Sequence, residues 1–307
     1  MLANYIVWNP SEGIDLGFIM IRYYSLMFVI AFGLGWMIMK QIFVRENEPI
    51  EKLDSLFIYT VIGTLLGARL GHVIFYQSEL FREDPLSILL PIRTVPEFEF
   101  TGFAGLASHG AAIAIIISTY LFSKKVMKKP LLWLLDRVVI TVAAGAVFVR
   151  IGNFINSEIV GTITQSKFGI QFLQDFYSKY DAIQITKIND YRAAYEAIAT
   201  DPQFAEFLAK VPAKHPAQLY ESVSYIFVFI LLYFLYWKTN ARFKQGYLFG
   251  LFLILLWTIR FVVEFVKESQ GGIEENLGYL STGQWLSIPF IILGFYFIWK
   301  SKLVADK

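Results

Sequence analysis

The sequence predicts an all-α integral membrane protein with seven transmembrane helices. Of its 307 residues, 56% are hydrophobic and 17% are charged. A water-soluble domain usually carries about 25% charged residues. Seven apolar runs are also long enough to cross the bilayer, which takes about 20 helical residues. They are residues 18–39, 53–76, 103–122, 131–154, 216–237, 246–266 and 282–299.

The distribution of Lys and Arg between these runs predicts the orientation. The short segments on one side of the expected membrane hold 13 Lys and Arg, and those on the other side hold 3. The side that is rich in Lys and Arg comprises residues 40–52, 123–130, 237–245 and 300–307. Short loops rich in Lys and Arg stay in the cytoplasm. We therefore expect the N-terminus outside and the C-terminus in the cytoplasm.

Individual runs carry further signals. No Lys or Arg precedes the first run, so we expect a retained anchor and not a cleavable signal peptide. In the second run, Gly63, Gly67 and Gly71 recur every four residues on one helix face. This stripe indicates close helix packing or a groove for lipid, and the two interpretations are compatible. Pro289 lies in the first turns of the seventh run, where a helix accepts proline more readily.

Residues 1–307 read as a single transmembrane domain with one sizeable insertion. The insertion, 155–215, is expected to form an extracytoplasmic head between the fourth and fifth spans, because a segment of that length is translocated largely regardless of charge. Residues 191–211 have the spacing of one or two short amphipathic helices, with Asp201 as an N-cap. We expect this head to cover a membrane pocket or to dock a protein substrate.

Composition excludes several kinds of site. The chain has no Cys, which rules out disulfides, thiolate metal sites and a nucleophilic cysteine of its own. With only three His, a His-rich metal site is not expected either. A net charge of +2 is too small to indicate a nucleic-acid partner.

Arginine, but no lysine, falls inside the predicted spans. Ionisable groups at membrane depth are costly and usually face a cavity, a partner or a ligand. Arg stays charged there, and its planar fork matches phosphate oxygens. For Arg137, which follows Asp136 near the cytoplasmic end of its span, a structural ion pair is expected. The five arginines are Arg22, Arg69, Arg137, Arg150 and Arg260.

Polar residues of five different spans are expected at one depth. At 1.5 Å of rise per residue, they lie within roughly 6–12 Å of the outer ends of their spans. The abundant anions at that depth are phospholipid head groups, so a phosphodiester lipid is the expected ligand. The residues at this level are Tyr24, Arg69, His109, Arg150 and Arg260.

The end of the fourth span has the highest density of polar residues. Arg150 and Asn153 are three apart and share one helix face, and Asn156 continues that face one turn on. With Glu158 they indicate the wall of a polar pocket. A frayed helix end with snorkelling side chains is the alternative.

Two more residues leave alternatives open. Glu264 follows Arg260 by four residues, which predicts either a local ion pair or a carboxylate that orients the guanidinium. His109 is either a hydrogen-bonded structural residue or a general base that takes a proton from an incoming nucleophile.

These residues fall in motifs that resemble the bacterial prolipoprotein diacylglyceryl transferase family. The family signature Gly-Arg-x-Gly-Asn-Phe-Ile-Asn-x-Glu-x-x-Gly corresponds to residues 149–161, with Val149 in place of the first glycine. After the His-Gly pair at 109–110, Ala111 stands where the family usually has a second glycine. The other matching motifs lie at residues 23–27, 67–71, 215–221 and 260–265.

The resemblance implies transfer of the diacylglyceryl group of phosphatidylglycerol to the thiol of the lipobox cysteine in a prolipoprotein. Glycerol phosphate leaves, and no metal or organic cofactor is needed. The implied partners are phosphatidylglycerol, prolipoprotein signal peptides with a lipobox cysteine, and membrane lipid. The implied location is the bacterial cytoplasmic (inner) membrane, with the active site toward the outer face.

The resemblance also implies residue roles by matching positions. Arg150 and Arg260 clamp the phosphate, and His109 is the candidate base; these three are the expected catalytic residues. His215 is expected to be a structural group at the mouth of the fifth span. The expected head-group site comprises Tyr24, Arg69, Arg150, Asn153, Asn156, Glu158, Gly161, Arg260 and Glu264.

Within this site, Asn153 and Tyr24 are expected to position the head group. Glu158 and Glu264 orient the polar network, and Gly161 permits a tight turn below the outer segment. The alternative function is a phospholipid flippase or anion transporter with an arginine-lined head-group site. Such transporters have inverted repeats and a midplane site with broken helices, and the sequence indicates neither.

Overall fold

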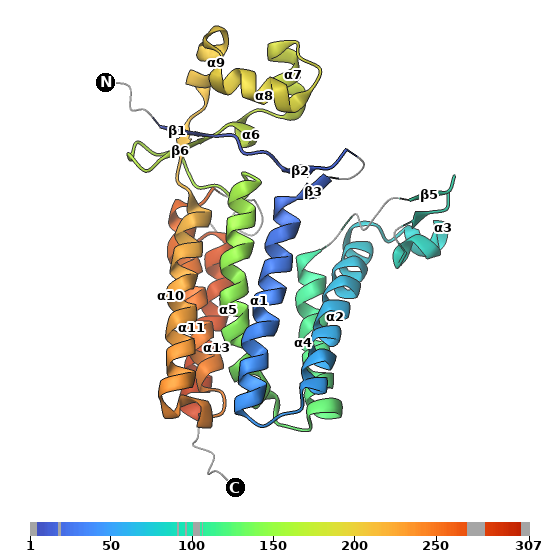
Figure 1. Cartoon of the computed structure of the whole chain (residues 1–307), viewed down its shortest axis with the longest axis vertical. Coiled ribbons are helices and arrows are strands. Elements are labelled where there is room, and N and C mark those ends of the chain that lie inside the picture. The colour runs from blue at the N-terminus through green and yellow to red at the C-terminus, as the bar shows by residue number, and fades with distance from the viewer. Residues whose placement is uncertain are drawn as a thin grey trace. The chain divides into compact units, whose positions relative to one another are not determined.

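The computed structural model describes residues 5–17, 20–90, 92–95, 97–100, 105, 107–268 and 280–301. In this part of the chain, seven helices are long and apolar enough to cross a membrane, which confirms the predicted fold class (Figure 1). They are α1 (Tyr23–Arg45), α2 (Ile50–Tyr76), α4 (Ser108–Phe122) with its π-helical continuation η2 (Ser123–Met127), α5 (Leu131–Ile155), α10 (Ala217–Lys238), α11 (Tyr247–Val263) with the 3-10 turn η5 (Glu264–Val266), and α13 (Thr282–Lys300).

The first span is shorter at its outer end than the apolar run. Residues Met20–Arg22 form strand β3, which pairs antiparallel with β2 (Gly13–Asp15), so helix α1 begins at Tyr23 and not at residue 18. Arg22 therefore lies outside the helix, contrary to the prediction. The apolar side chains of this segment are used by a hairpin, which hydropathy alone does not distinguish from a helix.

The start of one other helix also shifts an expected depth. Helix α4 begins at Ser108, because Gly105 has a left-handed φ of 69° and Ala107 is extended; residues 103, 104 and 106 lie outside the described part. Tyr24 and His109 are thus in the first turns of their helices, not six residues in. Arg260 lies six residues from the end of the span Tyr247–Val266, as expected.

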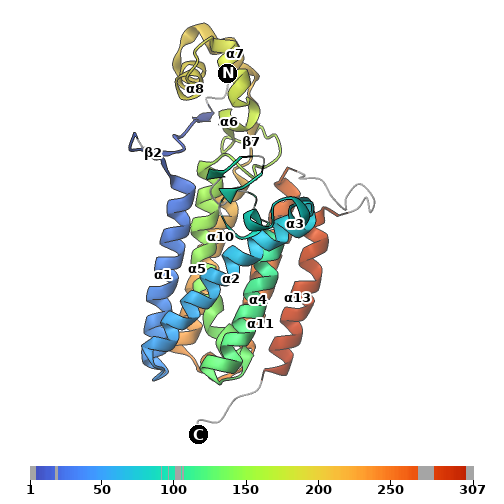
Figure 2. The ribbon, with the colours of Figure 1, turned by 90° about the vertical axis from the view of Figure 1, so that its right-hand side faces the viewer.

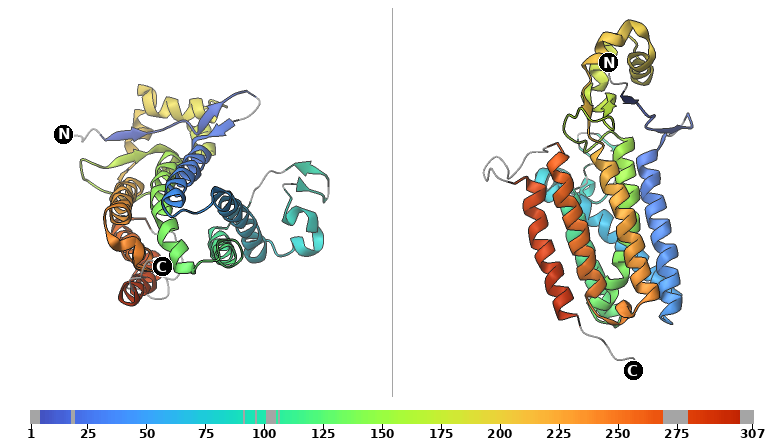
Figure 3. Two further views of the ribbon diagram at one scale, coloured as in Figure 1. Left: turned by 60° about the horizontal axis from the view of Figure 1, so that its bottom comes forward. Right: turned by 90° about the vertical axis from the view of Figure 1, so that its left-hand side faces the viewer.

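The chain divides into two compact units. The first comprises Met1–Met37 and Asp136–Lys307, and the second comprises Ile38–Leu135. In the first, α5, α10, α11 and α13 run side by side (Figures 1 and 3). Helices α11 and α13 approach closely at Gly250 and Gly294, since a Cβ on either glycine would lie 2.7 Å from the carbonyl oxygen of the other.

A buried carboxylate begins helix α11 after the 3-10 turn η4 (Asn240–Phe243). Asp136 accepts hydrogen bonds from the backbone N–H groups of Gly246 at 2.7 Å and Phe249 at 2.8 Å. These are donors that the start of a helix leaves without an internal partner. Arg137 lies close enough to Asp136 for electrostatic attraction. Both residues are buried, and their role at this end of the bundle is structural, as expected.

The segment between α5 and α10 forms a small folded region with the N-terminal strand (Figure 1). Strand β1 (Ile6–Trp8) pairs parallel with β6 (Ile170–Phe172), which pairs antiparallel with β7 (Ala213–Lys214). The segment's apolar core consists of Leu173, Ala182, Ala194, Tyr195, Ile198 and Val211. Its other elements are α6 (Leu173–Phe176), α7 (Lys179–Thr186), α8 (Tyr191–Thr200), η3 (Pro202–Phe204) and α9 (Ala205–Lys210).

Capping residues explain where the helices of this region begin. Asp190 accepts from the backbone N–H of Ala193 at 2.8 Å at the start of α8. Asp201 accepts from Gln203 N–H at 3.0 Å, so the predicted N-cap is confirmed, although it begins the 3-10 turn η3. In the apolar core of the same region, burial raises the pKa of the Tyr195 hydroxyl to about 12.

The second unit is built on helices α2 and α4, which run side by side (Figure 2). A Cβ on Gly63, Gly67 or Gly71 would lie 2.7 Å or less from Ser118, Ala114 or Gly110, respectively. The glycine stripe therefore allows close helix packing, which confirms that interpretation of the pattern. The remaining elements of this unit are α3 (Leu80–Glu83), η1 (Pro85–Ile88), β4 (Ile92–Arg93) and β5 (Glu99–Phe100).

Candidate functional site

The end of helix α5 is closed by a Schellman motif without glycine. The Ser157 N–H donates to the Phe154 carbonyl at 3.1 Å, and the Glu158 N–H donates to the Asn153 carbonyl at 2.9 Å. Ser157 takes the left-handed position with φ 55°, which glycine usually occupies. This tight ending turns Glu158 back over the last helical turn. The motif therefore replaces the frayed end that was the alternative interpretation.

Replacing Ser157 with glycine is expected to stabilise the protein by about 1 kcal/mol, because a non-glycine residue in the left-handed region costs roughly 1–2 kcal/mol. The Ser157 hydroxyl is also buried, without a hydrogen-bond partner among the described residues. Thermal unfolding in detergent measures the effect. A lower unfolding temperature for Ser157→Gly would contradict this account of the helix end.

Three side chains of this turn form one hydrogen-bonded group. The Glu158 carboxylate accepts from the Asn153 amide at 3.4 Å and from the Asn156 amide at 3.2 Å. On α10, the Gln218 amide donates to the Glu158 backbone carbonyl at 2.6 Å. Glu158 is therefore held in place from both its side chain and its backbone. Its expected place in an ordered polar network agrees with this geometry.

Arg150 is fixed from two helices. Its Nη1 donates to Asn153 Oδ1 at 3.2 Å, and its Nε lies 2.5 Å from Glu221 Oε2 on α10. The side chains of Arg150 and Glu221 are 11% and 2% exposed, so the pair is almost completely removed from solvent. Charged hydrogen bonds of this kind are short and strong. The guanidinium is thereby held in one orientation.

Arg260 belongs to the same environment. The Tyr225 hydroxyl donates to Glu221 Oε1 at 3.4 Å, and the guanidinium groups of Arg150 and Arg260 both lie within electrostatic range of that hydroxyl. The Arg260 Nε is buried and has no hydrogen-bond partner among the described residues. Helices α5, α10 and α11 thus place two arginines within electrostatic range of one tyrosine, and the Arg260 guanidinium also lies over the Trp257 ring, 5.6 Å from its centroid. We name Arg150, Glu221, Tyr225 and Arg260 the arginine cluster.

Tyr24 packs onto the signature from helix α1. Its hydroxyl lies close enough to the Asn153 side chain to interact with it. A Cβ on Gly152 would lie 2.9 Å from Cδ2 of the Tyr24 ring, so glycine at this position lets the ring approach. The structure therefore joins Tyr24 to the Asn153 network.

Glu264 forms an ion pair with Lys267. Its carboxylate lies 3.4 Å from Lys267 Nζ, and no ion pair within the described residues joins it to Arg260. It also faces Gly283 at the start of α13, where a Cβ would lie 2.4 Å from the Glu264 Cδ. The local ion pair with Arg260 is thus not formed, because η5 tightens the chain after Val263.

Gly161 serves close packing and not a tight turn, which corrects the prediction. Its φ is not in the left-handed region. A Cβ there would instead lie 2.5 Å from the carbonyl oxygens of both His215 and Val266. The Gly161 N–H donates to the His215 carbonyl at 2.8 Å, and Thr162 N–H donates to Val266 at 2.8 Å. The chain after α5 is therefore clamped between the start of α10 and the end of α11.

Two groups beside Gly161 support this clamp. His215 Nδ1 lies 3.1 Å from the Tyr220 hydroxyl, which agrees with the expected structural role of His215. Lys214 Nζ lies 2.7 Å from Asp175 and 2.8 Å from Glu268. Burial disfavours the charged form of Lys214, but the hydrogen bonds to the two carboxylates outweigh it and raise the pKa of the lysine.

Arg69 and His109 lie in the second unit. Arg69 donates to three backbone carbonyls: Ser87 at 2.7 Å, Ile88 at 3.1 Å and Gly105 at 3.4 Å. These bonds tie the segment after α2 to the helix. The backbone of His109 lies in the first turn of α4, and its side chain lies outside the described part of the structure.

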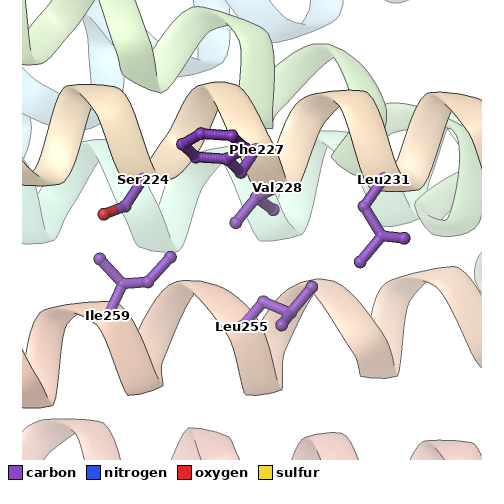
Figure 4. A pocket seen from close by; sticks show the side chains of 6 residues that line it. All are labelled: Ser224, Phe227, Val228, Leu231, Leu255 and Ile259. Atoms are coloured by element: carbon purple, nitrogen blue, oxygen red, sulfur yellow. The ribbon is translucent and has the colours of Figure 1, made fainter.

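An apolar groove of about 270 Å³ lies between α10 and α11 (Figure 4). Its single polar lining side chain, Ser224, donates its hydroxyl to the Tyr220 carbonyl at 2.7 Å. Such a lining suits hydrocarbon and not phosphate, so the charged chemistry belongs to the arginine cluster. The groove is lined by Ser224, Phe227, Val228, Leu231, Leu255 and Ile259.

Sequence reasoning missed Glu221 and Tyr225. Both stand in the fifth predicted span, and Glu221 closes a motif that resembles the family, but only His215 of that motif was given a role. A carboxylate inside an apolar run indicates a functional site as strongly as a buried arginine does. Counting acidic residues in the spans would have found Glu221.

In the described part of the chain, no group of three His, Asp or Glu is placed to hold a metal ion.

Comparison with known proteins agrees with these motifs. The family model of prolipoprotein diacylglyceryl transferase matches residues 12–300. Proteins named phosphatidylglycerol–prolipoprotein diacylglyceryl transferase are similar to the chain over nearly its whole length. The one from Tolumonas auensis is 36% identical over 94% of this chain and 95% of its own. Those from Bacteroides fragilis and Chloroherpeton thalassium are each 33% identical, over 95% and 99% of this chain and 94% and 97% of their own. The chain therefore belongs to the prolipoprotein diacylglyceryl transferase family.

Proposed function

We propose that this multi-pass membrane protein transfers the diacylglyceryl group of phosphatidylglycerol to the cysteine thiol of a prolipoprotein and releases glycerol phosphate. Family membership supports the activity and both substrates. The structural observation that supports the proposal is that Arg150 and Arg260, from two helices, both lie within electrostatic range of the Tyr225 hydroxyl. The transporter alternative finds no support in the relatives, which are named as transferases.

The reaction needs stabilisation of a developing phosphate charge. The cysteine sulfur forms a bond to the terminal carbon of the diacylglycerol part, and the C–O bond to the phosphate breaks. The phosphodiester, with one negative charge, becomes a phosphomonoester that gains a second. Cations already in place at that phosphate stabilise the transition state more than the bound lipid, so they raise the rate.

In this mechanism, Arg150 and Arg260 clamp the phosphate, and the buried Nε of Arg260 is a donor toward it. Asn153 and Tyr24 position the glycerol of the head group, with Asn156 and Glu158 in the same hydrogen-bonded group. Glu264 orients the neighbouring network through Lys267. Arg69 and Gly161 act outside the chemistry: Arg69 holds the segment after α2, and Gly161 holds the segment after α5.

The setting follows from the same proposal. The protein lies in the bacterial cytoplasmic (inner) membrane, with the N-terminus and the arginine cluster toward the outer face. The segment 155–215 forms an extracytoplasmic head of one transmembrane domain. The protein substrate is a prolipoprotein signal peptide with a lipobox cysteine. The excess of Lys and Arg in one set of loops supports this orientation.

The test uses the full-length protein in nanodiscs that contain phosphatidylglycerol, with a lipobox peptide added. We expect the peptide to gain the mass of a diacylglyceryl group and free glycerol phosphate to appear in equal amount. A peptide with serine in place of the cysteine should give neither product. Movement of phosphatidylglycerol between leaflets without peptide modification would favour the transporter and contradict the transferase.

His109 is proposed as the base that takes the thiol proton. A thiol has an ordinary pKa of about 8.5, so it needs a base or a cationic surrounding to react at neutral pH. We expect His109→Gln to slow transfer at pH 7 by about tenfold or more, within the range of general-base effects. Raising the assay pH above 8.5 should recover part of the loss. A turnover within twofold of wild type at pH 7 would discard this assignment.

A further inference from the structure

Glu221 is an unexpected component of a phosphate site. It is 1% exposed and lies in the second turn of the apolar helix α10, and a buried carboxylate there is costly unless it is paired. Its charge also offsets that of Arg150, which weakens the attraction of the site for an anionic lipid. A site selected for affinity alone would not contain it. Its presence therefore needs a reason other than charge.

The contacts of the carboxylate indicate that reason. One oxygen, Oε2, holds Arg150 Nε at 2.5 Å, and the other, Oε1, accepts from the Tyr225 hydroxyl at 3.4 Å. Arg150 Nη1 is held separately by Asn153 at 3.2 Å. Two nitrogens of one guanidinium are thus fixed by two different helices. The long arginine side chain, otherwise free to rotate, is confined to one orientation.

Tyr225 is the second partner of the carboxylate. Its hydroxyl donates to Glu221 Oε1, and it also lies within electrostatic range of Arg260. Tyr225 is 2% exposed, so its hydrogen bond to Glu221 is shielded from solvent. Tyr225 therefore helps to hold in place the carboxylate that holds Arg150.

We propose that Glu221, itself held by Tyr225, is a positioning residue for the transfer reaction that acts through Arg150. The proposal rests on the proposed function. Glu221 lowers the attraction of the site for the lipid, but it keeps the Arg150 guanidinium already placed where the phosphate charge develops. Fixed cations of this kind need no reorganisation at the moment of reaction, so they act on the rate more than on binding.

The test compares Glu221→Gln and Tyr225→Phe with wild type in nanodiscs of varied phosphatidylglycerol content. Gln keeps the size and an acceptor oxygen but removes the charge, and Phe removes only a hydroxyl, so at least the second variant should fold. We expect kcat to fall about tenfold or more for Glu221→Gln and severalfold for Tyr225→Phe. The KM for phosphatidylglycerol should stay unchanged or fall, because a negative charge near the anion is lost.

A control separates positioning from general stability. Ser222 is the buried neighbour of Glu221, and its hydroxyl donates to the Val147 carbonyl at 3.3 Å. Ser222→Ala should leave kcat within twofold of wild type. In an Arg150→Lys background, Glu221→Gln should lower kcat by less than twofold further, because a residue that acts through Arg150 has little left to position.

Three results would overturn the inference. They are a kcat within twofold of wild type for both variants, a raised KM with unchanged kcat, or an undiminished effect of Glu221→Gln in the Arg150→Lys background. Each is read against a wild-type enzyme that modifies the peptide in the same nanodiscs. An inactive wild type would instead count against the proposed function.

Discussion

Replacing Arg150 or Arg260 with alanine is expected to lower diacylglyceryl transfer by at least about a hundredfold, the usual effect of removing one preorganised charge donor from an active site. Both guanidinium groups are proposed to meet the phosphate, whose negative charge rises as the C–O bond breaks. Loss of either cation leaves that charge unshared in a poorly solvated site. The two single variants should therefore be similarly impaired.

The measurement is the rate of peptide modification by each variant at equal amounts of inserted protein. Arg150→Lys and Arg260→Lys separate the effect of charge from that of geometry, because lysine keeps the charge but not the planar fork. These two variants should recover only part of the rate. Arg192→Ala is the matched control. Arg192 forms an exposed ion pair with Asp15 at 3.0 Å, and such pairs contribute little to stability.

A specific result would contradict the clamp. If Arg150→Ala or Arg260→Ala keeps a rate within threefold of wild type while Arg192→Ala does too, the phosphate lies elsewhere. Arg150→Ala carries a second effect, since it leaves the buried Glu221 without its cationic partner. The unfolding temperature of each variant must therefore be measured beside its rate. Arg260→Ala lacks this complication and is the cleaner test.

Gly161→Ala is expected to lower the free energy of unfolding by about 1–3 kcal/mol, the usual cost of forcing extra volume into a packed site. The new Cβ would lie 2.5 Å from the carbonyl oxygens of His215 and Val266, and backbone atoms cannot move aside as a flexible side chain does. The backbone hydrogen bonds from Gly161 to His215, before α10, and from Thr162 to Val266, after α11, would be disturbed. Activity should fall as well, because Glu158 lies three residues before this clamp.

Thermal unfolding and transfer rate measure the two consequences. Gly33→Ala provides a matched control, because Gly33 lies in helix α1 and a Cβ there would meet nothing within 4 Å. That control should be neutral or slightly stabilising, since alanine favours a helix over glycine by about 0.5–1 kcal/mol. Equal unfolding temperatures for Gly161→Ala and wild type would contradict this prediction, because the backbone around Gly161 would then accommodate the methyl group without loss of stability.

All seven predicted spans are confirmed as helices, and five of them lie within three residues of their expected bounds. A run of some 20 apolar residues is stable in lipid as a helix, because the helix satisfies its own backbone hydrogen bonds. The first span starts later than expected, where a strand competes with the helix. Met20 and Ile21 are apolar as well, but with Arg22 they pair with residues 13–15 in a hairpin. Nothing in the hydropathy of a short segment distinguishes these outcomes.

The polar site was predicted in its components and not in its connections. Arg150, Asn153 and Glu158 were recognisable from their spacing at one helix end, and the structure joins them through Asn153. Of the two interpretations of Glu264, the local ion pair with Arg260 is not formed, because a spacing of four residues implies contact only where the helix continues. The chain tightens at Glu264, and the carboxylate is drawn to Lys267.

By itself, the sequence determined that this protein spans a membrane with seven apolar helices, that arginines are buried in them, and that its motifs are those of one enzyme family. These properties are local, since they depend on residue type and on distance along the chain. Only the tertiary structure decided that Glu221 of α10 pairs with Arg150 of α5, and that Tyr225 of α10 lies within electrostatic range of Arg260 of α11. These residues are far apart in sequence, and the packing of the helices determines which side chains share a buried space.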